Sequence, residues 1–181
     1  MAKTKRKHRV KSNNKTFFHP DIVCWFDGAT APMNPGGYMG WGAIIKDGEQ
    51  ERYFFDGKDK HDENSNNCAE YLGFIEILNY FLDTDTKNKQ ILIMGDSQLV
   101  VNQMSFRWDM KSGLYFRYAQ EAKGKLLKLL EKNIVVCRWI PRLENSDADQ
   151  LSNEGIKKVA GEYVAFDEKY WLKKYIEKQN K

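Results

Sequence analysis

The sequence predicts an α/β fold built on one five-stranded mixed sheet, with three antiparallel strands followed by two parallel ones and helices flanking the sheet. Two patterns support this prediction. Residues 20–57 form apolar segments separated by turn signals, and from residue 65 onward segments of helical periodicity alternate with short apolar runs. Strands followed by a β-α alternation are typical of one mixed sheet with helices packed on it.

The first half of the chain predicts an antiparallel unit. The apolar run 22–26 predicts a buried strand that ends at Asp27-Gly28, and residues 40–45 predict the next strand. Asp47-Gly48 is a hairpin signal, so residues 52–55 are expected to return as the third strand.

The second half predicts alternating helices and strands. Ser65-Asn66-Asn67 and Asp96-Ser97 are typical helix caps. The predicted elements are a helix at 69–82, a strand at 90–94, a helix from the cap at 96–97 to residue 104, a helical stretch at 113–130, a strand at 134–140 and a helix at 146–160.

A length of 181 residues suits one domain with tails. We expect a basic, disordered arm at 1–19, a folded domain at 20–160 and a helical extension at 161–181 that packs on the domain. The chain has no apolar run of the roughly 18–20 residues that a membrane span needs, and its charged start lacks a signal-peptide core. We therefore expect no membrane contact. Three widely spaced cysteines are typical of reduced thiols, so we expect an intracellular protein. We also expect a monomer.

The net charge of +4 is unevenly distributed. Residues 1–15 hold seven of the 29 basic residues and no acid, whereas the remaining 166 residues hold 22 basic and 25 acidic ones. Such an arm predicts contact with nucleic acid or a nuclear targeting signal, which would make the location nuclear rather than cytoplasmic. A solubilising tail without a partner is the alternative.

Four acidic residues stand at the edges of apolar elements. Asp27 follows the first strand and Asp96 the fourth, while Glu70 begins the apolar stripe of the first helix and Asp149 lies near the start of the last. Taken singly, each is explained as a turn residue, an N-cap or an acid stabilised by a helix dipole.

Taken together, the four acids predict a metal site. Strand ends and helix starts meet at one end of an α/β sheet. Converging carboxylates repel one another unless cations neutralise them, and hard oxygen ligands suit Mg²⁺, with Mn²⁺ as a substitute. Two such ions roughly 4 Å apart cleave phosphodiesters, one by activating a water and the other by stabilising the leaving oxygen.

Four sequence blocks surround these acids. They are Phe26-Asp27-Gly28-Ala29 with Asn34-Pro35-Gly36, then Ser65-Asn66-Asn67-Cys68-Ala69-Glu70, then Gly95-Asp96-Ser97-Gln98-Leu99-Val100, and finally Trp139-Ile140-Pro141-Arg142 with Asn145-Ser146-Asp147-Ala148-Asp149-Gln150-Leu151-Ser152. In this order they resemble the type 1 ribonuclease H family over roughly residues 20–160. The A-D-x-L-[AS] context of that family selects Asp149, rather than Asp147, as the fourth acid.

The resemblance implies a ribonuclease H-like fold, with residues 20–160 as the catalytic domain. It implies endonucleolytic cleavage of the RNA strand of RNA–DNA hybrids, which leaves 3′-hydroxyl and 5′-phosphate ends. Asp27, Glu70, Asp96 and Asp149 would be catalytic and would bind two Mg²⁺ ions, with Asp27 bridging both.

The resemblance also implies a set of substrate contacts. Short amides donate and accept hydrogen bonds, which suits the shallow minor groove where 2′-hydroxyls mark the RNA strand. Glycines let the backbone approach the nucleic acid. The expected contacts are Gly28, Asn34, Gly36, Ser65, Asn66, Asn67, Gln98, Trp108 and Arg142. The alternative role is a turn or cap residue for each amide and a core residue for Trp108.

The sequence departs from the family at two places. Many members carry a mobile histidine before the fourth aspartate, but residues 141–146 hold none. Arg142 or Glu144 would substitute, and Arg142 is the expected one. The family's basic handle segment is reduced to Phe106-Arg107-Trp108-Asp109-Met110-Lys111, so the arm at 1–15 is the expected source of positive charge for the hybrid.

Two other functions fit parts of the sequence. One is a non-catalytic module that binds RNA–DNA hybrids, although a pure binder gains nothing from clustered acids. The other is a DNA nuclease of related fold, such as a junction resolvase, which would lack the paired amides after Ser65.

Overall fold

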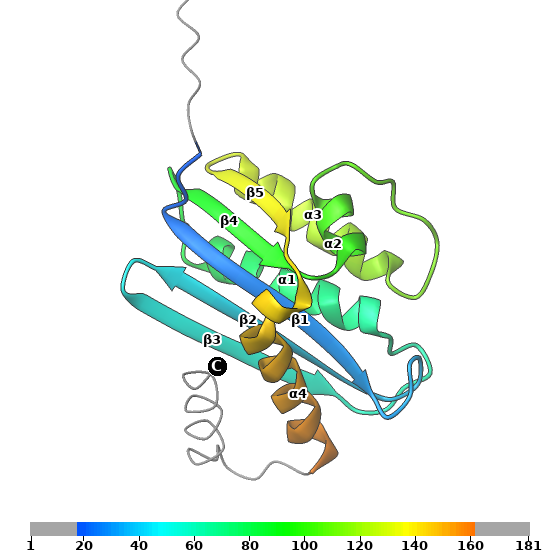
Figure 1. Cartoon of the computed structure of the whole chain (residues 1–181). Coiled ribbons are helices and arrows are strands. Elements are labelled where there is room, and N and C mark those ends of the chain that lie inside the picture. Colours follow the sequence, from blue (N-terminus) through cyan, green and yellow to red (C-terminus); the bar gives the residue numbers. More distant parts are fainter. Residues whose placement is uncertain (1–17, 162–181) are drawn as a thin grey trace, which may run out of the picture.

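The computed structural model describes residues 18–161, which form a five-stranded sheet with the order β3-β2-β1-β4-β5 (Figure 1). The strands are β1 (Ile22–Ala31), β2 (Tyr38–Asp47), β3 (Gln50–Lys58), β4 (Gln90–Gly95) and β5 (Ile134–Trp139). The β1-β2 and β2-β3 pairs are antiparallel, and the β1-β4 and β4-β5 pairs are parallel. The predicted mixed sheet is therefore confirmed. The arm up to residue 17 and the extension from residue 162 lie outside the described residues.

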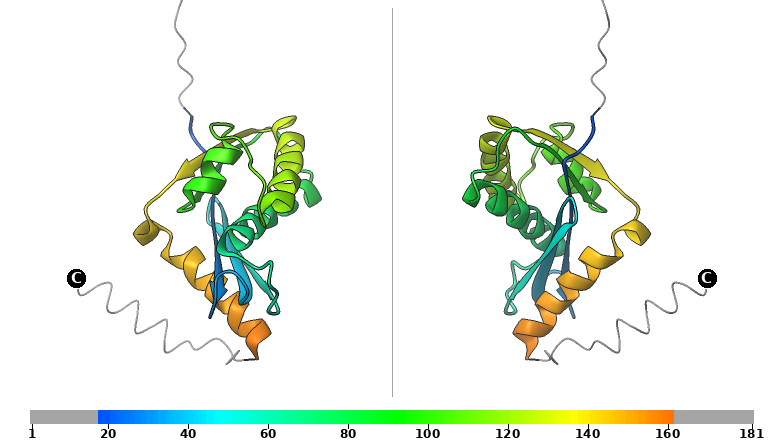
Figure 2. Two further views of the ribbon diagram at one scale, coloured as in Figure 1. Left: turned by 90° about the vertical axis from the view of Figure 1, so that its right-hand side faces the viewer. Right: turned by 90° about the vertical axis from the view of Figure 1, so that its left-hand side faces the viewer.

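Helices cover both faces of this sheet. They are α1 (Asn66–Asp83), α2 (Gln98–Met104), α3 (Phe116–Leu130) and α4 (Ser146–Ala160), with a short 3₁₀ helix, η1, at Arg142–Glu144. Figure 2 shows α1 and α4 on opposite sides of the strands. The main core lies between the sheet and α1, where the rings of Phe26 and Phe74 meet edge to face at 5.4 Å. Burial of these large apolar side chains is the main source of stability.

Several predicted boundaries differ from the structure: α1 begins at Asn66 rather than at residue 69, and β2 and β3 are longer than the segments expected at 40–45 and 52–55. Two further differences have a clear physical reason. The first strand does not end at Asp27-Gly28, because it continues to Ala31 and pairs with β2 along its whole length. Asp27 therefore lies inside a strand. The third helix begins at Phe116 rather than at residue 113, since Gly113 has a positive φ of 159° and forms a turn before the helix.

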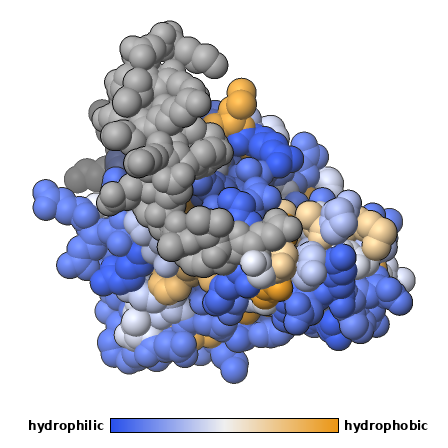
Figure 3. All heavy atoms as spheres, turned by 90° about the horizontal axis from the view of Figure 1, so that it is seen from below, coloured by the Kyte–Doolittle hydropathy of each residue, from blue (hydrophilic) through white to orange (hydrophobic). Residues whose placement is uncertain are grey.

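The visible part of the face seen from below is largely polar (Figure 3). Seen from below in Figure 3, the visible side chains are mostly hydrophilic, and apolar atoms form small separate patches. Among residues 18–161, no helix is both long enough and apolar enough to span a membrane.

Candidate active site

Asp27 lies where β1 loses one of its neighbours. The parallel pairing of β1 with β4 ends at Trp25 and Met94, whereas β1 continues for six further residues beside β2. The strand has antiparallel β2 on one side and parallel β4 on the other, so the end of the β1–β4 pairing is where the sheet changes from antiparallel to parallel. Ligands bind at such switch points of α/β sheets. The Asp27 side chain is 7% exposed, and its Oδ2 accepts a hydrogen bond from Ser152 Oγ at 3.3 Å.

Glu70 lies near Asp27 because α1 packs directly on β1. A Cβ at Gly28 would come 2.1 Å from backbone atoms of Ala69 and Glu70, a distance that no side chain can occupy. The absent side chain at Gly28 therefore brings the start of α1 against the strand. Glu70 is the fifth residue of that helix and is partly buried.

Asp96 directly follows β4, and the next residue caps α2. The Ser97 hydroxyl accepts a hydrogen bond from the Val100 N–H at 3.3 Å and donates one to Glu70 Oε2. One hydroxyl thus fixes the start of α2 and connects it to the acid on α1.

Asp149 lies in the first turn of α4, on the opposite face of the sheet from α1. Gly42 on β2 lets α4 approach, since a Cβ there would lie 2.4 Å from Leu151 Cβ. Asp149 Oδ1 forms an ion pair with the guanidinium of Arg142, whose side chain is 77% exposed. This pair raises the pKa of Arg142 above its ordinary value.

The negative charges of the other three acids act on the carboxyl of Asp27. Burial, followed by the charge of Asp96 and then those of Asp149 and Glu70, raises the pKa of Asp27 to about 8. Burial is also the main reason that the pKa of Glu70 rises to about 7; Asp96 adds to this rise, while the Ser97 hydrogen bond and Arg142 oppose it. A bound cation would favour the charged forms of both groups.

The donor set fits divalent metal ions by its chemistry. All four side chains offer hard oxygens, and their crowding favours a site for positive charge. Within residues 18–161, no group of three acidic, histidine or cysteine side chains already has the spacing of a formed metal site. All four acids instead hold partners from the protein, namely Ser152 on Asp27, Ser97 on Glu70, Asn145 on Asp96 and Arg142 on Asp149.

Part of the expected substrate set forms one exposed edge. Asn34, in the turn after β1, accepts a hydrogen bond on its Oδ1 from the Asn66 N–H at 3.0 Å. In the same turn, Gly36 adopts a positive φ of 110° and donates its N–H to Asn64 O at 2.9 Å. Asn67 follows on the exposed start of α1. The turn and the helix start are therefore held side by side.

The other expected contacts lie at the cap of α1, at the start of α2 and in the loop after α2. Ser65 caps α1 by accepting from the Cys68 N–H at 3.3 Å, and Gln98 is the exposed first residue of α2. Trp108 is 49% exposed in the loop after α2, so the alternative of a core tryptophan is wrong. Its backbone N–H donates to Asn102 O, but no hydrogen bond or ring contact described for residues 18–161 joins its side chain to the acids.

Sequence reasoning missed one residue at the centre of the site. Asn145 is 1% exposed, and its Nδ2 donates to both Phe26 O and Asp96 Oδ1 at 2.9 Å. Asn145 stands inside the fourth sequence block, four residues before Asp149, and this position was the available signal.

Comparison with known proteins decides the family. A family model described as reverse transcriptase-like matches residues 26–155. A ribonuclease H of Bordetella avium is 30% identical over 151 residues, covering 77% of this chain and 92% of the relative. The crystal structure of RNase H1 from Halobacterium salinarum superposes with a TM-score of 0.63 at 27% identity, covering 76% of this chain and 98% of that one. The chain belongs to the type 1 ribonuclease H family.

Other ribonuclease H relatives define the extent of the match. A bifunctional protein of Mycobacterium tuberculosis is 30% identical over 127 residues, which are 70% of this chain but 33% of the relative. The chain thus spans about one third of the length of that relative. The fold is also that of LC11-RNase H1, solved in complex with an RNA/DNA hybrid, with a TM-score of 0.66 and 23% identity over 77% of this chain and 99% of that one.

Proposed function

We propose that this protein hydrolyses the RNA strand of RNA–DNA hybrids endonucleolytically, by a two-metal-ion mechanism that leaves 3′-hydroxyl and 5′-phosphate ends. The observation that carries the proposal is the meeting of Asp27 with Glu70, Asp96 and Asp149, whose charges all act on the Asp27 carboxyl. Membership of the ribonuclease H family supports the choice of an RNA–DNA hybrid as substrate.

The proposed cofactor is a pair of Mg²⁺ ions, which Mn²⁺ can replace. When bound, such ions supply a nucleophilic water and stabilise the leaving oxygen. Asp27 is the proposed bridging ligand, because its carboxylate interacts with the other three. Glu70, Asp96 and Asp149 complete the ligand set, and the hydrogen bond from Ser97 holds the Glu70 carboxylate in a fixed orientation.

The edge formed by the turn after β1 and the start of α1 is the proposed binding surface for the hybrid. Its exposed amides, Asn34, Asn66 and Asn67, can contact minor-groove edges and 2′-hydroxyls, and Gly28 and Gly36 permit close backbone approach. The remaining proposed contacts are Ser65 and Gln98 at helix starts, Trp108 in the loop after α2, and Arg142 beside Asp149. The hybrid complex of LC11-RNase H1, which shares this fold, supports a hybrid as ligand.

The basic arm is the proposed second contact with nucleic acid. Residues 1–15 carry seven basic side chains, whereas the rest of the chain has a small negative net charge. We place the protein inside the cell as a monomer, in the nucleus if the arm is a targeting signal. The extension from residue 161 is proposed to pack on the domain.

A substrate comparison tests the proposed function. The full chain is incubated with an RNA–DNA hybrid, double-stranded RNA and branched DNA, each in Mg²⁺ and in Mn²⁺. We expect cleavage of the hybrid alone, in its RNA strand. Binding of the hybrid without turnover in either metal would favour the binding module, and cleavage of branched DNA would favour a resolvase.

A pair of matched variants tests the acids. Asp96→Asn removes a negative charge but keeps an oxygen that accepts the hydrogen bond from Asn145, so the fold should be retained. Asp85→Asn makes the same chemical change at an exposed acid that is ion-paired with Lys87 and Lys132. We expect Asp96→Asn to lose at least 99% of hybrid cleavage, on the order of the 10²–10³-fold effects seen when one group that stabilises transition-state charge is removed. Asp85→Asn should retain wild-type activity.

A further inference from the structure

Asn145 occupies the junction of the acid-bearing segments. Its side chain is buried between the end of β4 and the middle of β1, where Nδ2 donates to Asp96 Oδ1 and to Phe26 O, both at 2.9 Å. Phe26 precedes Asp27 in the strand. A single amide group therefore binds one acid directly and the backbone next to a second.

The backbone of the same residue holds the third acid. Asn145 O accepts a hydrogen bond from the Asp149 N–H at 3.0 Å, and the Asn145 N–H donates to Arg142 O at 3.0 Å. The main chain of Asn145 thus begins α4. Its side chain makes no cap bond to the helix, because it is bonded to Phe26 and Asp96 instead. Asn145 is therefore hydrogen-bonded to Asp96 and Asp149, and to the residue that precedes Asp27.

The orientation of the amide follows from its partners. Phe26 O and Asp96 Oδ1 are both acceptors, so the group between them must be the NH₂. The Asn145 Oδ1 is then buried without a hydrogen-bond partner within the described residues. A buried acceptor without a partner opposes folding, so this amide is poorly explained as a stabilising residue alone.

We propose that Asn145 is a positioning residue for metal binding. By donating to Asp96, it orients that carboxylate and leaves most of its lone pairs free for a metal ion. By holding Phe26 O and the Asp149 N–H, it also fixes the backbone beside two of the acids. Together these bonds set the spacing between Asp27, Asp96 and Asp149. This role rests on the proposed two-metal function. Loss of the amide would leave the three acids free to move apart, as their mutual repulsion favours.

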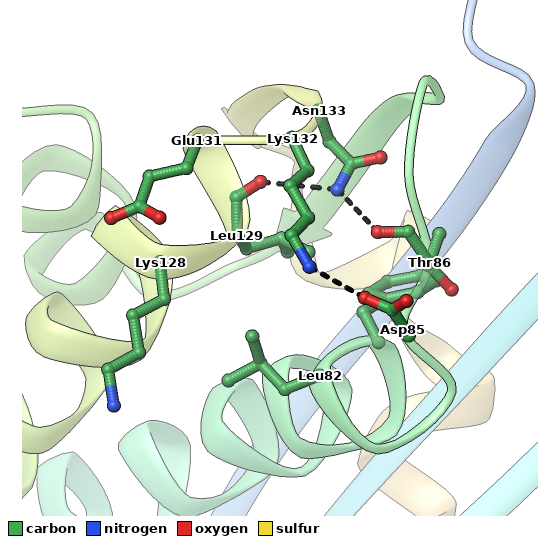
Figure 4. A pocket seen from close by; sticks show the side chains of 9 residues that line it. Leu82, Asp85, Thr86, Lys128, Leu129, Glu131, Lys132 and Asn133 are labelled. Carbon is green, nitrogen blue, oxygen red and sulfur yellow. Dashed lines mark hydrogen bonds and ion pairs between the residues drawn. The ribbon is translucent and has the colours of Figure 1, made fainter.

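The chain offers a matched control in Asn133. This asparagine is also buried, at 8% exposure, and its Nδ2 also donates to two oxygens, Thr86 O at 2.8 Å and Leu129 O at 3.2 Å. Figure 4 shows its amide facing both groups, beside a hollow of about 370 Å³. Asn133 precedes β5, at the end of the sheet opposite to Asp96, so its loss should cost stability without reaching the acids.

The test compares Ala and Ser variants at the two positions in the full chain. Binding of Mn²⁺ alone is measured by the electron paramagnetic resonance signal of the free ion, thermal unfolding gives Tm, and hybrid cleavage gives the Mg²⁺ concentration for half-maximal rate. We expect both Asn145 variants to bind Mn²⁺ at least tenfold more weakly and to need at least tenfold more Mg²⁺. The Asn133 variants should keep the wild-type Mn²⁺ affinity and Mg²⁺ requirement, although their Tm falls by a similar or larger amount. The Ser variants keep a small polar group and serve if an Ala variant does not fold.

The outcomes separate this role from the proposed function. The positioning role would be overturned if Asn145 and Asn133 variants of equal Tm had the same Mn²⁺ affinity and the same Mg²⁺ requirement. The nuclease proposal would still stand. A wild-type chain that binds no Mn²⁺ and cleaves no hybrid would overturn the proposed function itself.

Discussion

The Ser97 hydroxyl donates a hydrogen bond to Glu70 while it caps α2 by accepting from the Val100 N–H. The first of these bonds crosses 27 residues of sequence and joins the starts of α1 and α2. Because Asp96 immediately precedes Ser97, the cap also fixes where the chain turns after β4. Helix capping and the orientation of an acid are therefore functions of one side chain.

Replacing Ser97 with Ala should reduce both stability and metal binding. Loss of an N-cap costs about 0.5–2 kcal/mol, which corresponds to a Tm lower by about 2–4 °C per kcal/mol in a chain of this size. The pKa of Glu70 should rise further, because the Ser97 hydrogen bond lowers it. Thermal unfolding and Mn²⁺ titration measure the two effects, and Ser97→Thr should restore both.

Ser65→Ala is the matched control for that variant. Ser65 caps α1 with the same 3.3 Å geometry, but no hydrogen bond described for it reaches an acid. Equal weakening of Mn²⁺ binding in the two Ala variants would contradict the assigned role of the Ser97–Glu70 bond.

Without metal, the stability of the protein should depend on pH through Asp27. The folded-state pKa of about 8 lies above the ordinary value of 3.8, so the native protein binds more protons than the unfolded chain between these values. The free energy of unfolding therefore falls as pH rises from about 4 to about 8. Tm is measured in the presence of a chelator from pH 5 to 9, and the Tm of the wild type should decline relative to that of Asp27→Asn. The difference in free energy of unfolding between the two proteins should grow by at least about 1 kcal/mol, or about 2–4 °C in Tm.

Two comparisons complete the pH experiment. Asp85→Asn should run parallel to the wild type over this range, because ion pairs lower the pKa of Asp85 to about 2 and its contribution is lost only in stronger acid. Added Mg²⁺ should recover more Tm at pH 8 than at pH 5, as ions bind the deprotonated acids. A difference between wild type and Asp27→Asn that stays constant with pH would exclude the raised pKa.

Elements with local signals were predictable from the sequence. The helix expected at 146–160 has the bounds of α4, because Gly161 stops it in a left-handed conformation with φ of 73°. Ser65 and Ser97 are the caps that their sequence contexts indicate. The order of strands and helices followed from periodicity for the same reason, since both signals arise from neighbouring residues.

Features that depend on distant residues were not predictable. Asp27-Gly28 has the composition of a turn, but Gly28 is needed for contact with Ala69, so the strand continues. Asn145 acts on Phe26 across 119 residues and on Asp96 across 49, and neither relationship leaves a periodic trace in the sequence. The sequence placed four acids at element edges, but it did not reveal the hydrogen bonds that orient them.

Adding one methyl group at Gly28 should disrupt the site from within the fold. The new Cβ of Gly28→Ala would meet the backbone of Ala69 and Glu70 at 2.1 Å, so α1 must move away from β1. Overpacking of this kind costs about 1–3 kcal/mol or more and should displace Glu70. Urea unfolding and hybrid cleavage should both show large losses.

The same substitution at Gly124 should have the opposite effect on stability. Gly124 lies within α3, and a Cβ there would meet nothing within 4 Å, so Gly124→Ala should stabilise the protein by up to about 1 kcal/mol. Hybrid cleavage should be unchanged. Comparable stability of the two variants would show that α1 does not rest on Gly28 as described.

Arg142 should contribute to turnover rather than to metal binding. Its guanidinium is 77% exposed and occupies Asp149 Oδ1, so it competes with cations for that oxygen and is free to contact a phosphate. Arg142→Ala should slow hybrid cleavage about 10–100-fold, the equivalent of losing one charged hydrogen bond, without raising the Mg²⁺ requirement. Arg142→Lys keeps the charge but not the planar donor pair and should recover only part of the rate.

A partly buried arginine on β3 controls for the loss of charge. Arg52 donates to Gln50 and lies far along the sheet order from β5, so Arg52→Ala should cleave hybrid at the wild-type rate. An equal loss in the two Ala variants would mean that Arg142 acts only through net charge.

Deleting residues 1–15 should weaken hybrid binding and flatten its salt dependence. Each phosphate that the seven basic residues neutralise steepens the plot of log affinity against log salt by about 0.7–0.9. The measurement is fluorescence anisotropy of a labelled hybrid at several salt concentrations, in an Asp96→Asn background that prevents cleavage. A full-length chain with these seven residues changed to Gln should behave like the deletion, because charge and not length is responsible. Identical slopes for all three proteins would show that the arm does not contact the hybrid and that the acidic domain binds it unaided.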